Sequence, residues 1–202
     1  MKLRRIHLFE IEDQSYCPSW LRDMMTSMIV VLHRWFGVAQ VVADEIRSIA
    51  TTKDIKNVAV IDLCSGAGGP MPEVLQELNS AAGGPSGDSN VNTSPSDIGR
   101  QYQVALTDLY PNQSAVERFH ETPNLHYCRT PIDASQVDSR VALGSAEHGS
   151  DEHGSDRPRI GEIETEKADL KGSLVIRTMV CSFHHMPPKV ASAILKDAQD
   201  NH

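Results

Sequence analysis

The stretch that decides the fold spans residues 58–70 and reads VAVIDLCSGAGGP. Its first half, VAVIDL, is a short, β-branched run of the kind that is buried on both faces of a parallel sheet. The second half contains Gly66 and Gly68, which suit a tight turn because glycine tolerates positive φ and leaves the backbone accessible. The stretch therefore predicts a buried strand, a tight turn and the first residues of a helix.

The rest of the chain alternates between the same two kinds of element. Apolar residues recur at helical spacing in some segments, and short apolar runs between them have the composition of strands. We expect helices at 18–36, 38–49, 70–78, 113–120 and 187–198, and further strands at 103–109, 125–129 and 173–183. Alternating strands and helices predict an α/β architecture with a parallel sheet.

Two stretches of biased composition interrupt this alternation. Residues 79–99 are rich in Gly, Ser, Pro, Asn and Asp, and residues 139–171 combine Ser and Gly with acidic residues in the near repeat EHGSDEHGSD. Such segments bury too little apolar surface to offset the entropy lost on ordering, so we expect two flexible insertions. The predicted organisation is an N-terminal helical segment, 1–54, followed by a domain, 55–202, that carries both insertions.

The charge of the chain is concentrated in one segment. The 202 residues include 19 basic and 27 acidic side chains, for a formal net charge of −8. Residues 147–169 hold eight acidic and three basic residues, so −5 of that charge lies in the second insertion. The remainder is nearly balanced and has no basic stripe, which makes nucleic acid the least favoured partner.

The sequence favours a cytoplasmic protein without membrane insertion. The most apolar stretch is interrupted by His33 and Arg34, and no run reaches the roughly 18 uncharged apolar residues of a span. Glu10 and Glu12 stand where a signal peptide has its apolar segment. The four cysteines show neither CxxC nor Cys/His ligand spacing, so we expect reduced thiols and predict no metal site.

The glycine turn narrows the choice of ligand. A dinucleotide-binding turn reads G-x-G-x-x-G, but Met71 occupies the place of the third glycine, which disfavours a nicotinamide-dependent oxidoreductase. The chain also lacks the G-x-x-x-x-G-K-[ST] pattern of a P-loop. Doubly wound sheets bind ligands at the carboxyl ends of their strands, so we interpret the turn as part of a nucleoside site.

Residues 62–68, DLCSGAG, resemble motif I of the class I S-adenosylmethionine-dependent methyltransferases, [DE]-x-G-x-G-x-G. Asp62, Gly66 and Gly68 match this pattern, whereas Cys64 replaces the first glycine. The segments IHLFEIEDQSYCPSWLRDMMT and FHHMPPKVASAILKDA are similar to a bacterial-type subgroup of the family, so the resemblance spans most of the chain outside the insertions. It implies a Rossmann-like, doubly wound, mostly parallel sheet, here partial with about four strands, preceded by N-terminal helices.

Acidic residues after the next two strands extend the resemblance. Asp108 matches the family's acidic residue that accepts hydrogen bonds from ribose hydroxyls, and Asp133 resembles a carboxylate near the adenine amino group. The alternatives are a structural strand-to-helix corner for the turn and a solvated or capping aspartate for Asp133. The resemblance implies that S-adenosylmethionine is bound by Asp62, Cys64, Ser65, Gly66, Ala67, Gly68, Asp108, Leu109, Ile132 and Asp133.

Two histidines follow the fourth predicted strand, in the segment CSFHHMPP. The family's corresponding segment lines the methyl pocket, and a neutral histidine there accepts a proton from a hydroxyl or amine nucleophile. His184 and His185 are therefore the candidate catalytic residues, with His184 favoured. The alternative is a pair that shapes the pocket wall, or caps the next helix, without proton transfer.

The resemblance also predicts that the domain is partial. The family's sheet has seven strands in the order 3-2-1-4-5-7-6, whereas we expect four here, so the chain looks like a fragment or shortened product. An uncovered fourth strand is open to self-association. The predicted function is methyl transfer from S-adenosylmethionine to an unknown small molecule or protein. The alternative is a catalytically incomplete module that binds a nucleoside or a protein partner.

Overall fold

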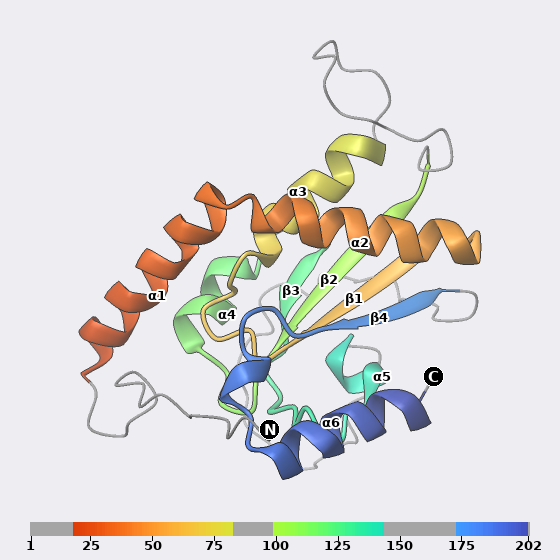
Figure 1. Cartoon of the computed structure of the whole chain (residues 1–202). Coiled ribbons are helices and arrows are strands. Elements are labelled where there is room, and N and C mark those ends of the chain that lie inside the picture. The colour runs from red at the N-terminus through yellow and green to blue at the C-terminus, as the bar shows by residue number, and fades with distance from the viewer. Residues whose placement is uncertain (1–17, 83–98, 144–172, 202) are drawn as a thin grey trace, which may run out of the picture.

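The fold is built around one parallel sheet. The computed structural model describes residues 18–82, 99–143 and 173–201 (Figure 1). Four strands pair in the order β3-β2-β1-β4, and all three pairings are parallel. The strands are β1 (Asn57–Leu63), β2 (Gln101–Thr107), β3 (Leu125–Tyr127) and β4 (Leu174–Thr178).

Helices cover both faces of the sheet. One hydrophobic core joins α2, α3 and α4 to the sheet, whereas α5 and α6 lie on the opposite face (Figure 1). This arrangement confirms the predicted α/β, doubly wound fold, with an all-parallel sheet. The helices are α1 (Ser19–Trp35), α2 (Val38–Lys53), α3 (Met71–Ala82), α4 (Gln113–Phe119), α5 (Ser139–Ala142) and α6 (Pro188–Asp200), with a 3₁₀ helix η3 (Phe183–His185).

Burial explains the uninterrupted apolar character of β1. Val58 and Val60 pack into the core under α2, α3 and α4, whereas Ala59, Ile61 and Leu63 pack into the core on the other face. A central strand that is covered on both sides has no solvent-facing set of residues, so no polar alternation appears in its sequence. The interpretation of VAVIDL as a buried parallel strand is confirmed.

The strand order places a topological switch point at the carboxyl end of β1. The chain adds β2 and then β3 on one side of β1, and returns to place β4 on the other side. The order thus reverses between β1 and β4, which is where doubly wound folds hold their ligands. The register sets Asp62 of β1 opposite Thr178 of β4, and Leu63 opposite Thr107 of β2.

The fourth strand is shorter than predicted. It ends at Thr178 instead of continuing to residue 183, and residues 183–185 form the 3₁₀ helix η3. Beyond Thr178 the backbone N–H of Val180 turns toward the carboxylate of Asp62, and Cys181 takes a left-handed conformation with φ 61°. These two features turn the chain out of the sheet, which the apolar composition of 173–183 does not reveal.

Helices occupy the first residues of both predicted insertions. Residues 79–82 extend α3, where the Ser80 hydroxyl bonds to the carbonyl of Gln76 at 2.7 Å. Residues 139–142 form α5, which is capped by the Asp138 carboxylate and followed by the buried Leu143. Alanine and leucine side chains favour helix and burial there despite the nearby low-complexity sequence. The segments 83–98 and 144–171 lie outside the described residues.

Helix α1 leaves a row of large apolar side chains in solvent. Trp35 is 84% exposed and the adjoining Phe36 is 72% exposed, and their ring centroids lie 6.1 Å apart. An ion pair of 2.5 Å between Arg34 and Glu73 links the end of α1 to the first turn of α3. Among the described residues, no helix combines the length and the apolarity that crossing a bilayer requires.

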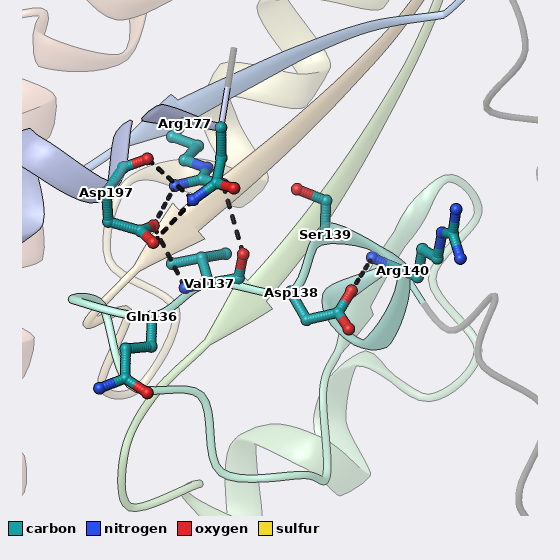
Figure 2. Close-up of a pocket in the computed structure, with 8 residues that line it drawn as sticks. Gln136, Val137, Asp138, Ser139, Arg140, Arg177 and Asp197 are labelled. Atoms are coloured by element: carbon teal, nitrogen blue, oxygen red, sulfur yellow. Dashed lines mark hydrogen bonds and ion pairs between the residues drawn. The ribbon is translucent and has the colours of Figure 1, made fainter. Parts of the chain in front are cut away.

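An ion pair fastens α6 to the sheet. The Arg177 Nη1 atom of β4 lies 2.5 Å from Oδ2 of Asp197 in α6, and the two side chains are only 13% and 12% exposed. The same carboxylate accepts the Val137 N–H, and Arg177 Nη2 donates to the Val137 carbonyl (Figure 2). The pair therefore joins α6, β4 and the loop that leads to α5.

We expect Asp197→Ala to lower the free energy of unfolding by about 2 kcal/mol, because it leaves the shielded Arg177 guanidinium without its carboxylate. Urea denaturation of wild type and variant measures this change. Asp200→Ala is the matched control, since Asp200 is an exposed aspartate of the same helix. Equal losses in the two variants would contradict the assigned role of the ion pair.

Candidate functional site

The turn after β1 has an unusual backbone conformation. Cys64, Gly66, Gly68 and Gly69 all have positive φ, at 58°, 54°, 108° and 51°. A Cβ atom on Gly68 would lie 2.7 Å from Cε2 of Phe119, so only glycine lets α4 pack this closely. A Cβ atom on Gly66 would meet nothing within 4 Å. The turn is thus closed against α4 at Gly68 and open to solvent at Gly66.

Asp62 lies beneath this turn and holds it in place. Its side chain is 3% exposed, and its carboxylate accepts hydrogen bonds from Ser65 Oγ at 2.7 Å and Thr178 Oγ1 at 2.8 Å. Its backbone carbonyl accepts a further bond from the Thr107 hydroxyl at 2.9 Å. The predicted cofactor-binding residues Asp62 and Ser65 are therefore buried supports of the turn in this structure.

Burial raises the pKa of Asp62 from 3.8 to about 6. Removal from water is the largest cause, and the negative charge of Asp108 raises the pKa slightly further. Hydrogen bonds from Ser65, Thr178 and the Val180 backbone act in the opposite direction, because they stabilise the ionised form. The site therefore keeps a buried carboxylate that is costly to ionise.

The free energy of unfolding should fall as the pH rises from about 4 to 6. The folded protein holds the Asp62 proton more tightly than the unfolded chain does. The stabilising contribution of this group is therefore complete below the unfolded pKa of 3.8 and is lost as the pH rises through the folded pKa of about 6. A shift from 3.8 to about 6 corresponds to a loss of about 3 kcal/mol from this group. Denaturation at a series of pH values measures the loss.

Asp62→Asn should remove this component of the pH profile, because asparagine does not titrate. Asp200→Asn, which removes an exposed carboxylate, is the control and should leave the profile unchanged. Parallel profiles for wild type and Asp62→Asn between pH 4 and 6 would show that Asp62 does not carry the effect.

Asp108 joins the end of β2 to the glycine turn. Its carboxylate is partly exposed; Oδ2 accepts the Gly66 N–H at 3.0 Å and Oδ1 accepts the Tyr110 N–H at 2.9 Å. Each carboxylate oxygen keeps further acceptor capacity, because a carboxylate offers about four lone-pair sites. The structure thus brings together Gly66 and Asp108, which are 42 residues apart in the sequence.

The loop after β3 also reaches this region. The Ile132 N–H donates to the Asp108 carbonyl at 2.9 Å, while the Ile132 side chain is buried in the second core. Asp133 is exposed, and its Oδ1 accepts bonds from the backbone and hydroxyl of Ser135, which lower its pKa. This local turn matches the structural alternative for Asp133. Leu109, beside Asp108, presents a 45% exposed apolar surface.

Negative charge surrounds the turn. Burial is the largest cause that raises the pKa of the Cys64 thiol to about 11, and the negative charges of Asp108, Asp62 and Asp133 contribute to the same rise. The thiol therefore stays protonated and unreactive at neutral pH. More important for ligand binding, carboxylates from the ends of three strands act on the same place. Such a field attracts a cation and repels a phosphate.

Cys64→Gly should stabilise the protein by roughly 0.5 kcal/mol, because a non-glycine residue in the left-handed region is strained and the extra chain entropy of glycine offsets part of the gain. Thermal unfolding measures the change. Ala67→Gly provides the control, because Ala67 is not among the residues with positive φ and should lose stability instead. Stabilisation of both variants, or of neither, would contradict the strain at Cys64.

Three supporting residues escape sequence reasoning. Thr107 and Thr178 are the last residues of the strands that flank β1, and both direct their hydroxyls to Asp62. The Tyr127 hydroxyl, at the end of β3, donates to the Gly66 carbonyl at 2.7 Å. The only available signal is a hydroxyl-bearing residue at the end of each neighbouring strand, and it becomes informative once the register is known.

The two histidines occupy η3, beyond the carboxyl end of β4. Their ring centroids lie 4.0 Å apart with the planes tilted by 38°; His184 is exposed and His185 is partly buried. The segment that carries them starts at Thr178 and Val180, which both bond to Asp62. The histidines therefore come after β4 in the chain, as expected, but residues 179–183 separate His184 from the end of β4 at Thr178.

A cavity among the described residues lies elsewhere, away from the glycine turn. It has a volume of about 440 Å³ and is lined by residues around Arg177 and Asp197, none of which belongs to the glycine turn (Figure 2). At its wall the Arg177–Asp197 ion pair and the Val137 backbone bond to one another. Within the described parts of the chain, no three His, Cys, Asp or Glu side chains are placed to hold a metal ion.

No family model, curated protein or solved structure matches this chain. The geometry and charge of the turn are therefore the observations that bear on its function.

Proposed function

We propose that this protein binds S-adenosylmethionine at the carboxyl end of β1 and transfers its methyl group to a small molecule or a protein. The observation that carries the proposal is the bond between the exposed Gly66 backbone and the partly exposed Asp108 carboxylate. It joins an open turn to a hydrogen-bond acceptor at the point where the strand order reverses.

Ribose hydroxyls fit this arrangement. Asp108 has lone pairs that Gly66 and Tyr110 do not use, so it can accept hydrogen bonds from two neighbouring hydroxyl groups. Exposed Leu109 and the adjoining Tyr110 offer apolar surface beside the carboxylate for a flat base. Because Gly66 has no side chain, a ligand is able to approach the turn closely.

The charge of the site favours a cationic nucleoside over a phosphorylated one. Burial is the main cause of the raised pKa of Cys64, and the negative charges of Asp108, Asp62 and Asp133 add to it. The same charges disfavour the negative pyrophosphate of a dinucleotide. A sulfonium carries a positive charge next to its ribose. The site therefore supports S-adenosylmethionine over NAD, in agreement with the Met71 substitution in the dinucleotide pattern.

Bound S-adenosylmethionine supplies an activated methyl group on a positively charged sulfur. The contribution of the protein is alignment of the nucleophile and exclusion of water. His184 and His185, beyond the end of β4, are the candidates for accepting the proton that a hydroxyl or amine nucleophile loses. The methyl acceptor and the cytoplasmic location stay predictions from the sequence.

A nucleoside-binding or protein-interaction module is the second candidate function. The observation in its favour is that β4 is an edge strand among the described residues, so that half of its backbone groups face away from the sheet. Pairing of that edge with a second chain would complete the hydrogen bonding of β4. Activity against a panel of acceptors separates this candidate from a methyltransferase.

Calorimetric titration with S-adenosylmethionine and S-adenosylhomocysteine tests the proposed site. Wild type should bind both, and Asp108→Asn should weaken binding by about 10-fold or more, because a neutral amide offers fewer acceptors to the ribose. Titration with NAD should give no binding. An unchanged affinity in Asp108→Asn, or tighter binding of NAD than of S-adenosylmethionine, would contradict the proposal.

Gly66→Ala with Gly69→Ala as control tests the open face of the turn. Both glycines have similar positive φ and space for a Cβ atom, so both variants should lose about 1 kcal/mol of stability. Only Gly66→Ala should weaken nucleoside binding, because its methyl group would occupy the open face of the turn at the residue whose N–H bonds to Asp108. Equal affinities in the two variants would place the ligand elsewhere.

A further inference from the structure

We infer, on the basis of the nucleoside site proposed above, that Tyr127 is a positioning residue whose hydroxyl holds the Gly66 peptide in place and thereby orients the Asp108 carboxylate. The Tyr127 hydroxyl donates to the Gly66 carbonyl at 2.7 Å, and the Gly66 N–H donates to Asp108 Oδ2 at 3.0 Å. Gly66 is thus fastened on both sides, once to β3 and once to the end of β2.

Packing cannot replace these two hydrogen bonds. Gly66 is exposed and a Cβ atom there would meet no neighbour within 4 Å, so no side chain packs where a Gly66 side chain would lie. Gly66 also adopts a left-handed φ of 54°. Glycine populates positive and negative φ about equally, so the residue type alone does not fix this conformation. The conformation of the Gly66 peptide therefore depends on its hydrogen-bond partners.

Tyr127 reaches the turn after β1 from β3, which lies on the far side of β2. Its ring is 6% exposed and belongs to the core formed with α4 and β2, so the position of its hydroxyl is set by packing. Tyr127 is paired with Leu106 of β2, and β1 is the next strand beyond, about 10 Å away at ordinary strand spacing. Burial raises its pKa to about 12, so the hydroxyl stays a donor at neutral pH.

The loss of this hydroxyl should affect binding more than folding. In Tyr127→Phe the ring still fills the core, and the exposed Gly66 carbonyl is able to bond to water instead. The Gly66 N–H would then no longer be held against Asp108, and the carboxylate would lose a partner that fixes its rotation. The affinity for the ribose would fall, whereas the strand pairings of the sheet would be unchanged.

Hydrogen exchange of the ligand-free protein, combined with calorimetry, tests the inference. Tyr127→Phe should speed exchange of the Gly66 and Gly68 amides by about 5-fold and weaken binding of adenosine and S-adenosylhomocysteine by a similar factor, as expected for one hydrogen bond. Exchange of the β1 amides should not change. Tyr102→Phe is the matched control, since Tyr102 is a buried tyrosine near the amino end of β2, at the edge of the sheet opposite the glycine turn.

The outcomes separate the positioning role from the proposed function. Unchanged exchange at the turn with intact nucleoside binding would overturn the role of Tyr127 alone. Faster exchange in β1 and in the turn alike would also overturn it, because it would show general destabilisation. A wild-type protein that binds no nucleoside would overturn the proposed function, and the exchange rates would still report whether Tyr127 holds the turn.

Discussion

The hydrogen bonds to the buried carboxylate of Asp62 are the constraint on which the candidate site depends. Ser65, Thr178 and the backbone of Val180 all donate to it, so one side chain ties the turn after β1 to the segment after β4. These two segments follow the carboxyl ends of β1 and β4, between which the strand order reverses. The carboxylate therefore adds side-chain bonds at the carboxyl end of β1 to the pairing of β1 with β4 along the two strands.

The buried carboxylate that supports the turn lowers the stability of the folded protein when it is ionised. A carboxylate removed from water is costly to ionise, and only part of that cost is offset by its three donors. Left-handed Cys64 adds local strain in the same turn. A strained turn over a buried charge serves no purpose in a simple strand-to-helix connection, and its combination with exposed Gly66 and partly exposed Asp108 is what one expects of a binding site.

Much of the fold was predictable from local patterns. The apolar run of β1, the helical periodicity of α2 and α6 and the glycines of the turn are properties of short segments, and each one was placed within a few residues. The end of β4, the end of α3 and the presence of α5 differ from the prediction. Strand β4 ends where the Val180 backbone bonds to Asp62, and α5 is followed by Leu143, which is buried in the second core. Such contacts involve residues far apart in the chain.

The sequence by itself determined the α/β class, the glycine turn and the acidic residues at the strand ends, because periodicity and backbone freedom are local properties. Only the tertiary structure decided which of these residues are buried beneath the turn and which are exposed beside it. Asp62 and Asp108 look equivalent in the sequence, yet the first is buried and the second is partly exposed. The role of Tyr127 depends on the pairing order of three strands, and strand order is set by packing across the whole sheet.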